Sequence, residues 1–232
     1  MNFHTQCLSE VLMLCVIMFP SAYIYFLKPF VQIRNNTLLS ENLVTVIVYG
    51  SLAALGAATG SAGLSDAELF PRTETEIFLL ICLLAVAAGG FNVAAEYTEA
   101  AIPILRRTGR LPAMRPAGIY RGSFSFVNFC SIIAAAALEE FAFRQFMMGG
   151  VLRALGMSLW PSILLSAFFY GMNHVYFGRF AVLQKFTSGL VFAALFAVSG
   201  GNLLPCILCH TAQNLILYFY AVTRREQKGA RV

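Results

Sequence analysis

The feature that most constrains this chain is a pair of long segments without a charged side chain. Leu43 to Ser65 and Ile77 to Ala95 contain no Asp, Glu, Lys or Arg. At about 1.5 Å per residue, a helix of either length crosses a hydrocarbon core of about 30 Å. The chain as a whole is 59% hydrophobic and 12% charged, whereas soluble domains have roughly 25% charged residues. The sequence therefore predicts an integral membrane protein and excludes a soluble fold.

Five further apolar stretches follow the same pattern: Val11 to Leu27, about Phe124 to Leu155, about Leu159 to His174, about Phe180 to Ser199, and Leu203 to Val222. The first is interpreted as a retained helix rather than a signal peptide, because it has no basic segment before it and contains Pro20. The fold class predicted is all-α, a polytopic transmembrane helical bundle of about seven to eight membrane helices.

The longest break in the apolar pattern runs from about Glu96 to Gly122 and contains three prolines. The predicted organisation therefore has four parts. About three N-terminal transmembrane helices (residues 1–100) are followed by a basic loop (101–122), a four-helix membrane core (123–222) and a basic tail (223–232). Arginines gather in the loop and the tail, so the positive-inside rule places both, and with them the C-terminus, in the cytoplasm. The N-terminus is then expected outside. The net charge of +5 needs no nucleic-acid partner, since membrane topology and anionic lipids account for it.

The fourth apolar stretch contains two adjacent carboxylates and an arginine, Glu139, Glu140 and Arg144. Each charge at bilayer depth costs about 2.5–3.5 kcal/mol unless it pairs or faces a cavity, so a function is the first inference. Glu140 and Arg144, at i and i+4, are predicted to form an ion pair. Glu139 points about 100° away around the helix and can face water as a base. The alternative is a helix that ends near Leu138, but the apolar residues that follow favour a helix continuing towards Leu155.

Two later stretches carry a histidine. His174 closes the fifth, and His210 and Asn214 share a helix face in the seventh. Asn214 could orient the imidazole of His210 or bind an oxyanion. Cys206, Cys209 and His210 also have the C-x-x-C-H spacing of c-type haem attachment. Haem is the weaker interpretation, because the motif occurs once, lies in an apolar helical run and has no separate axial ligand.

The polar motifs, taken in chain order, resemble those of the CPBP family of intramembrane proteases. This family includes the type II CAAX prenyl endopeptidases and bacterial bacteriocin-processing or self-immunity proteins of the Abi group. The similarity covers roughly residues 120–220 and rests on the motifs Glu139-Glu140-x-x-x-Arg144, an aromatic residue four positions before His174, and His210-x-x-x-Asn214. Tyr170 stands where the family pattern has Phe, a change expected to affect packing more than catalysis.

The resemblance implies a role for each motif residue. Glu139 would activate the attacking water with His174, and Glu140 would be tied to Arg144. His210 and Asn214 would complete the site and stabilise the tetrahedral oxyanion. The reaction implied is hydrolysis of a peptide bond in a membrane-associated protein or peptide.

The two histidines and the first glutamate (His174, His210 and Glu139) could also bind a divalent metal such as zinc. No H-E-x-x-H pair is present, and a metal-free glutamate mechanism is compatible with the family, so the sequence makes no cofactor certain. The expected partners are membrane lipids and a hydrophobic, lipidated or membrane-anchored protein substrate. The expected location is a bacterial or archaeal inner membrane, and the oligomeric state is unknown.

Two other function classes stay open. A catalytically silent member of the family could act as a membrane scaffold or a bacteriocin immunity protein. A transporter or channel ranks lower, because its expected hallmark is a pair of corresponding broken helices in two repeats, and the sequence has no internal repeat.

Overall fold

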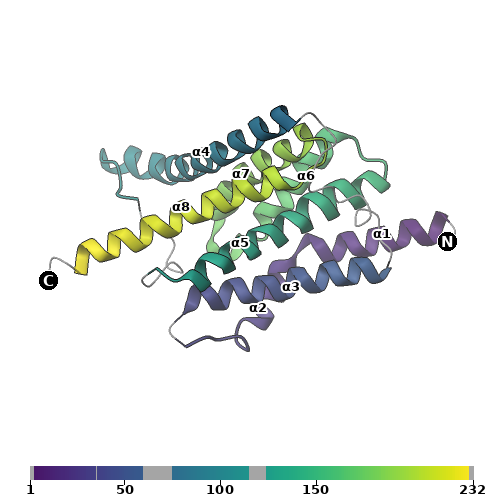
Figure 1. The fold of residues 1–232 in the computed structure, drawn as a ribbon, viewed down its shortest axis with the longest axis horizontal. Helices are drawn as coiled ribbons and strands as arrows, with labels where there is room; N and C mark the ends of the chain where they lie inside the picture. The colour runs from purple at the N-terminus through teal and green to yellow at the C-terminus, as the bar shows by residue number, and fades with distance from the viewer. Residues whose placement is uncertain (1–2, 35, 60–74, 115–123, 230–232) are drawn as a thin grey trace.

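The computed structural model describes residues 3–34, 36–59, 75–114 and 124–229. Over these residues every regular element is a helix (Figure 1): α1 (Phe3–Met18), α2 (Pro20–Leu27), α3 (Thr37–Thr59), α4 (Thr75–Thr108), α5 (Phe126–Glu140), the π-helix η1 (Phe141–Leu152), α6 (Leu159–Met172), the 3₁₀-helix η2 (Val175–Phe177), α7 (Arg179–Val198) and α8 (Leu204–Gly229).

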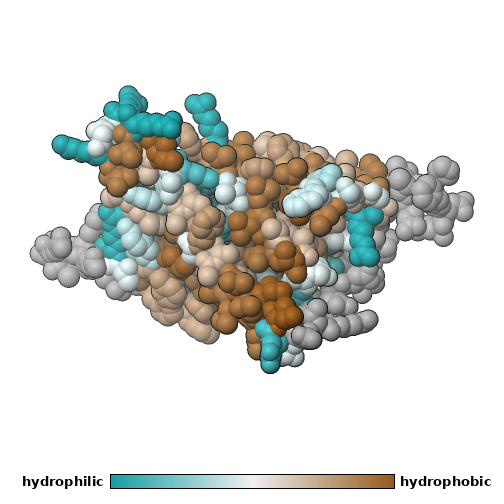
Figure 2. Space-filling view, turned by 90° about the horizontal axis from the view of Figure 1, so that it is seen from above, coloured by the Kyte–Doolittle hydropathy of each residue, from teal (hydrophilic) through white to brown (hydrophobic). Residues whose placement is uncertain are grey.

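Within the described ranges, five helices are long and apolar enough to cross a membrane. They are α3, α4, the continuous helix Phe126–Leu152, α7 and α8, and α6 is a shorter apolar helix. Figure 2 shows hydrophobic residues across the middle of one face, with hydrophilic residues mostly towards the ends. The predicted all-α membrane bundle is confirmed.

The first apolar stretch differs from its prediction. The sequence predicts one helix from Val11 to Leu27, but the structure has two, α1 and α2, with Phe19 between them in a non-helical conformation. Pro20 lies in the first turn of α2. There its missing N–H removes no hydrogen bond, whereas inside one continuous helix its ring would clash with the preceding turn.

The basic segment after α4 also begins differently from its prediction. The sequence predicts a break from about Glu96 and a loop from residue 101, but α4 continues through Pro103 to Thr108. Likewise, α8 continues into the predicted basic tail as far as Gly229. The part of the loop at 115–123 and the end of the predicted Leu43–Ser65 segment, from residue 60, lie outside the described residues.

The helix that carries the paired carboxylates is long, as the sequence predicts. It begins after Ser125, whose side chain accepts a hydrogen bond from the backbone N–H of Asn128, and continues without interruption to Leu152. From Phe141 onwards it has π-helical hydrogen bonding, a rare form that is frequent at functional sites.

The helices pack so that α5 lies between α3 and α8, while α4 packs on α7 and α8 (Figure 1). Close approach depends on small residues, as is common between membrane helices. At Gly89 of α4 a Cβ atom would come within 2.6 Å of the Cys209 carbonyl oxygen of α8. At Gly189 of α7 it would come within 3.1 Å of the Cα of Ala167 in α6. This packing brings α5, α6, α7 and α8 around one polar site.

Candidate active site

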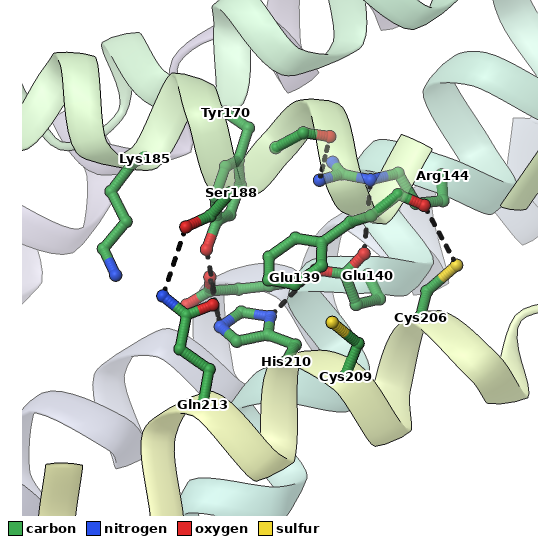
Figure 3. Close-up of polar contacts among 12 residues, drawn as sticks. Glu139, Glu140, Arg144, Tyr170, Lys185, Ser188, Cys206, Cys209, His210 and Gln213 are labelled. Carbon is green, nitrogen blue, oxygen red and sulfur yellow. Dashed lines mark hydrogen bonds and ion pairs between the residues drawn. The ribbon is translucent and has the colours of Figure 1, made fainter. Parts of the chain in front are cut away.

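The two adjacent carboxylates have different surroundings (Figure 3). The side chain of Glu140 is completely buried, and its Oε2 lies 3.2 Å from Nε of Arg144, which is also completely buried. The side chain of Glu139 is 17% exposed and lines a cavity. One carboxylate is therefore held in an ion pair, while its neighbour faces open space.

Arg144 has further contacts beyond its partner carboxylate. Its guanidinium donates to Ser166 Oγ at 3.5 Å and to the Gly189 carbonyl oxygen at 3.3 Å. The guanidinium carbon lies 5.0 Å from the ring centroid of Tyr170 and 5.4 Å from that of Phe192. These contacts from α6 and α7 compensate a cation that would otherwise be very unfavourable in the protein interior.

His210 of α8 contacts both carboxylates of α5. Its Nδ1 lies 2.8 Å from Glu140 Oε1, and its Nε2 lies 4.0 Å from Glu139 Oε2. Nε2 is also 3.4 Å from the Tyr170 hydroxyl, and the imidazole stacks on Phe192 with ring centroids 4.9 Å apart. Because the ion-paired carboxylate of Glu140 accepts hydrogen bonds, a proton lies on Nδ1. The ring is thus oriented by Glu140 and Tyr170, whereas its position in the sequence suggests Asn214 for this role.

His174 follows the end of α6 and has a defined ring orientation as well. Its Nδ1 is 2.9 Å from the backbone oxygen of Tyr170. Since a carbonyl oxygen can only accept, Nδ1 carries the proton, and in the neutral ring Nε2 keeps a free lone pair. That nitrogen can accept a hydrogen bond from water.

A cavity of about 870 Å³ collects these groups. Its wall includes Glu139, His174, His210 and Asn214, while Glu140 and Arg144 lie behind the wall and support it. The structure therefore brings all six sequence-predicted residues together. Four line the cavity wall, Glu140 contacts His210 from behind the wall, and Arg144 is joined through its ion pair with Glu140. The geometry fits a base that faces a water-accessible space and a histidine held from behind.

A second polar cluster adjoins the same cavity and was not identified from the sequence. Glu96 Oε1 of α4 accepts from Lys185 Nζ at 2.7 Å, from Gln213 Nε2 at 2.7 Å and from Ser188 Oγ at 3.3 Å. The Gln213 side chain also accepts from Asn92 at 3.1 Å. The sequence signal that could have identified this cluster is Lys185 inside the apolar stretch Phe180 to Ser199, because a charge at membrane depth needs a polar partner.

Tyr170 was also not predicted as a site residue. Its hydroxyl lies beside His210, and it lines the cavity. The sequence shows an aromatic residue one turn before His174, but it does not show that a hydroxyl from α6 meets an imidazole from α8. That contact depends on tertiary packing.

The residues named as zinc candidates are not gathered as a ligand group. Across the described ranges, no group of three or more His, Cys, Asp or Glu side chains is arranged to hold a metal ion. Nδ1 of each histidine is engaged, one with Glu140 and the other with a backbone carbonyl, so only Nε2 of each ring faces away from these partners. As they lie here, Glu139, His174 and His210 do not form a metal-ligand group.

The cysteines of the C-x-x-C-H motif are both completely buried. Cys206 Sγ donates to the Phe192 carbonyl oxygen at 3.3 Å, and Cys209 packs in the main hydrophobic core. Attachment of a porphyrin to these thiols would require unpacking α8. The packing supports the interpretation of His210 as part of the carboxylate site.

Comparison with known proteins identifies a similarity in the same part of the chain. Residues 121–216 match the family model described as "Type II CAAX prenyl endopeptidase Rce1-like". No curated protein matches the chain. The matched segment contains all six predicted site residues and the helices that carry them, α5, η1, α6 and α7, with most of the apolar part of α8. In this C-terminal membrane segment, the chain is similar to the Rce1-like type II CAAX prenyl endopeptidases.

Proposed function

We propose that the protein is an intramembrane endopeptidase that hydrolyses a peptide bond of a membrane-associated protein or peptide, using water activated by Glu139. The observation that carries the proposal is the different environment of two adjacent carboxylates. Glu140 is buried and paired with Arg144, whereas Glu139 faces the cavity. A general base must reach water in a substrate-sized space, and Glu139 meets this requirement.

In the proposed reaction, a water molecule in the cavity donates one hydrogen bond to Glu139 and another to Nε2 of His174. As Glu139 takes a proton, the water oxygen attacks the carbonyl carbon and a tetrahedral oxyanion forms. Asn214 and the His210 side of the cavity face this oxyanion. Glu139 then passes its proton to the nitrogen of the leaving amine, and the C–N bond breaks.

The role of Glu140 and Arg144 in this proposal is structural. Glu140 fixes the orientation of His210 through Nδ1, and Arg144 pairs with the Glu140 carboxylate at a depth where a single charge would be unstable. A substrate that lies in or on the membrane fits a cavity set among apolar helices. The family name suggests a prenylated protein with a C-terminal CAAX sequence, and other hydrophobic or membrane-anchored segments are the alternative substrates.

The test is a comparison of the termini of membrane proteins and peptides between cells that carry the wild-type chain and cells that carry Glu139→Gln. This substitution keeps the side-chain size but removes the base, so cleavage products of the wild type should disappear. Glu76→Gln is the matched control, because Glu76 is an exposed carboxylate at the start of α4, outside the cavity wall. Identical termini in wild type and Glu139→Gln would contradict proteolysis and favour the membrane scaffold or immunity function.

A further inference from the structure

The second polar cluster joins three helices, and the carboxylate of Glu96, from α4, lies at its centre. Its Oε1 accepts hydrogen bonds from Lys185 of α7 and from Gln213 of α8, each at 2.7 Å. Ser188 of α7 donates to the same oxygen at 3.3 Å. A single oxygen atom of α4 is therefore bonded to both α7 and α8.

The side chain of Gln213 is held at both ends of its amide group. Its nitrogen donates to Glu96 and also to Ser188 Oγ at 3.2 Å (Figure 3), and its oxygen accepts from Asn92 Nδ2 at 3.1 Å. Gln213 is 1% exposed and Asn92 is fully buried. Because Asn92 and Glu96 are four residues apart, they share one face of α4. We call this set of contacts the α4 clamp on Gln213.

The backbones of α4 and α8 are also closest at this level. A Cβ atom at Gly89 would come within 2.6 Å of the Cys209 carbonyl oxygen and within 3.0 Å of the Gln213 backbone nitrogen. The glycine contact sets the distance between the two helices, whereas the α4 clamp opposes rotation of α8 about its own axis.

Rotation of α8 matters because the same turn carries two residues of the candidate active site. His210 lies three residues before Gln213 and Asn214 lies directly after it, and both line the cavity. A side-chain tip lies about 5–6 Å from the axis of its helix, so a rotation of about 10° moves it by about 1 Å. A misplacement of that size can lower a reaction rate by about 100-fold.

We propose that Asn92 and Glu96 are positioning residues of the active site. By holding Gln213 they fix the rotation of α8, and with it the places of its two cavity residues. The inference rests on the proposed endopeptidase function, because it assigns these residues to the same reaction. Both lie before residue 121, where the similarity to the Rce1-like endopeptidases begins. The N-terminal section of the chain thus takes part in building the site.

The test compares Gln213→Leu with Asn128→Leu in the purified full-length chain in detergent. Gln213→Leu approximately keeps the side-chain volume and removes the amide that the clamp holds. Asn128→Leu is the matched control, because Asn128 is also a buried amide, 3% exposed, that accepts from Asn36 at 2.9 Å but does not line the cavity. Thermal unfolding establishes that each variant is folded at the temperature of the measurements.

The first measurement is the set of proton resonances of the imidazole rings, which requires no substrate. The chain has three histidines, and His210→Gln identifies the signals of His210. This ring stacks on Phe192 with centroids 4.9 Å apart, so a small displacement changes its chemical shifts. Gln213→Leu should shift the His210 signals, and Asn128→Leu should leave them at their wild-type positions.

The second measurement is cleavage of an internally quenched, farnesylated peptide with a C-terminal CAAX sequence. Gln213→Leu should lower kcat by about 10- to 100-fold and leave KM within about threefold, since the groups of the reaction are misplaced while the rest of the cavity is unchanged. Asn128→Leu should keep kcat within about twofold of wild type, because it does not touch the clamp.

An exchange of the two partners separates positioning from a direct role of the Glu96 charge. The double variant Glu96→Gln with Gln213→Glu keeps one carboxylate and one amide between α4 and α8, together with Lys185. It should bring kcat back to within about fivefold of wild type, whereas each single change should be slower. A double variant as slow as the single variants would contradict the inference.

The inference requires both effects in folded Gln213→Leu, and either one without the other overturns it while the proposed function stands. If the wild type does not cleave this peptide, the same chains are compared on a peptide whose terminus changes in the Glu139→Gln cells. If no such peptide exists, the proposed function fails. The imidazole resonances then decide separately whether the clamp holds His210 in place.

Discussion

Arg144 is the residue on which the buried charges of the site depend. It neutralises Glu140, and neither side chain has measurable exposure. Removing one partner of a buried ion pair leaves an uncompensated charge and typically costs about 3–5 kcal/mol. Arg144 is therefore important mainly because its loss would leave the buried Glu140 carboxylate without a counter-charge, and less because of the net energy of the ion pair.

We expect Arg144→Met to lower the free energy of unfolding by about 3–5 kcal/mol, because Glu140 would stay buried without its cation. Thermal unfolding of the detergent-purified protein measures the effect. Lys28→Met is the matched control, since Lys28 pairs with Glu41 but is 41% exposed, and a solvent-exposed pair contributes about 0–1 kcal/mol. An equal decrease in the free energy of unfolding for both variants would contradict the role assigned to Arg144.

Side-chain positions could be predicted from the sequence where the geometry of a single helix determines them. The spacing of Glu140 and Arg144 predicts their ion pair, and the structure contains it. The contact between Tyr170 and His210 joins α6 to α8, and no local spacing encodes it. The same holds for Glu96 and Lys185, which meet only because α4 packs on α7.

Among the helices, the contact between α4 and α8 is sensitive to a single methyl group. A Cβ at Gly89 would lie 2.6 Å from the Cys209 carbonyl oxygen and 2.8 Å from the Cβ of Ala212. The next residue, Gly90, has much more room, with Ile216 Cδ1 at 3.9 Å from the corresponding position. The two glycines thus form a natural pair for comparison.

Gly89→Ala should push α4 away from α8 and destabilise the protein by about 1–3 kcal/mol, the usual cost of overpacking. Gly90→Ala should be neutral or stabilising by up to about 1 kcal/mol, because alanine favours the helix and meets no close neighbour. Thermal unfolding midpoints of the two variants check this. If Gly90→Ala lowers the unfolding midpoint as much as Gly89→Ala, the close contact between Gly89 and α8 is not the cause of the destabilisation.

Helix boundaries were predicted less well than helix existence, and for identifiable reasons. The apolar pattern continues across Phe19 and Pro20, so hydrophobicity alone does not reveal the break between α1 and α2. Conversely, Pro103 and the arginines after it suggest a loop, yet α4 includes them up to Thr108. The change from α- to π-helix after Glu140 is not visible in the pattern of hydrophobic residues in the sequence.

At the scale of the whole molecule, the ends of α4 and α8 lie at the same end of the bundle. The Met114 backbone oxygen accepts hydrogen bonds from Tyr220 and from Arg224 of α8, and Tyr97 of α4 donates to the Pro112 oxygen at 2.8 Å. Among the described residues, this end carries Arg106, Arg107 and Arg110 at the end of α4 and Arg224 of α8, so the positive-inside rule predicts that it faces the cytoplasm.

We therefore expect a C-terminal fusion of green fluorescent protein to fluoresce when the chain is produced in bacteria, because this reporter folds in the cytoplasm. A C-terminal alkaline phosphatase fusion, which becomes active outside the inner membrane, should be inactive. The opposite pair of results would reverse the predicted orientation.

The unbroken helix from Phe126 to Leu152 also limits how the length of this protein can vary. Its first turn is fixed by a hydrogen bond between the Ser125 backbone and Tyr218, and its last by one between Met157 N and the Leu152 oxygen. Deleting one residue between these anchors would turn one part of the helix against the other by about 100°. Glu139 would then leave the cavity, so insertions and deletions in homologous chains should fall outside this segment even where substitutions within it are frequent.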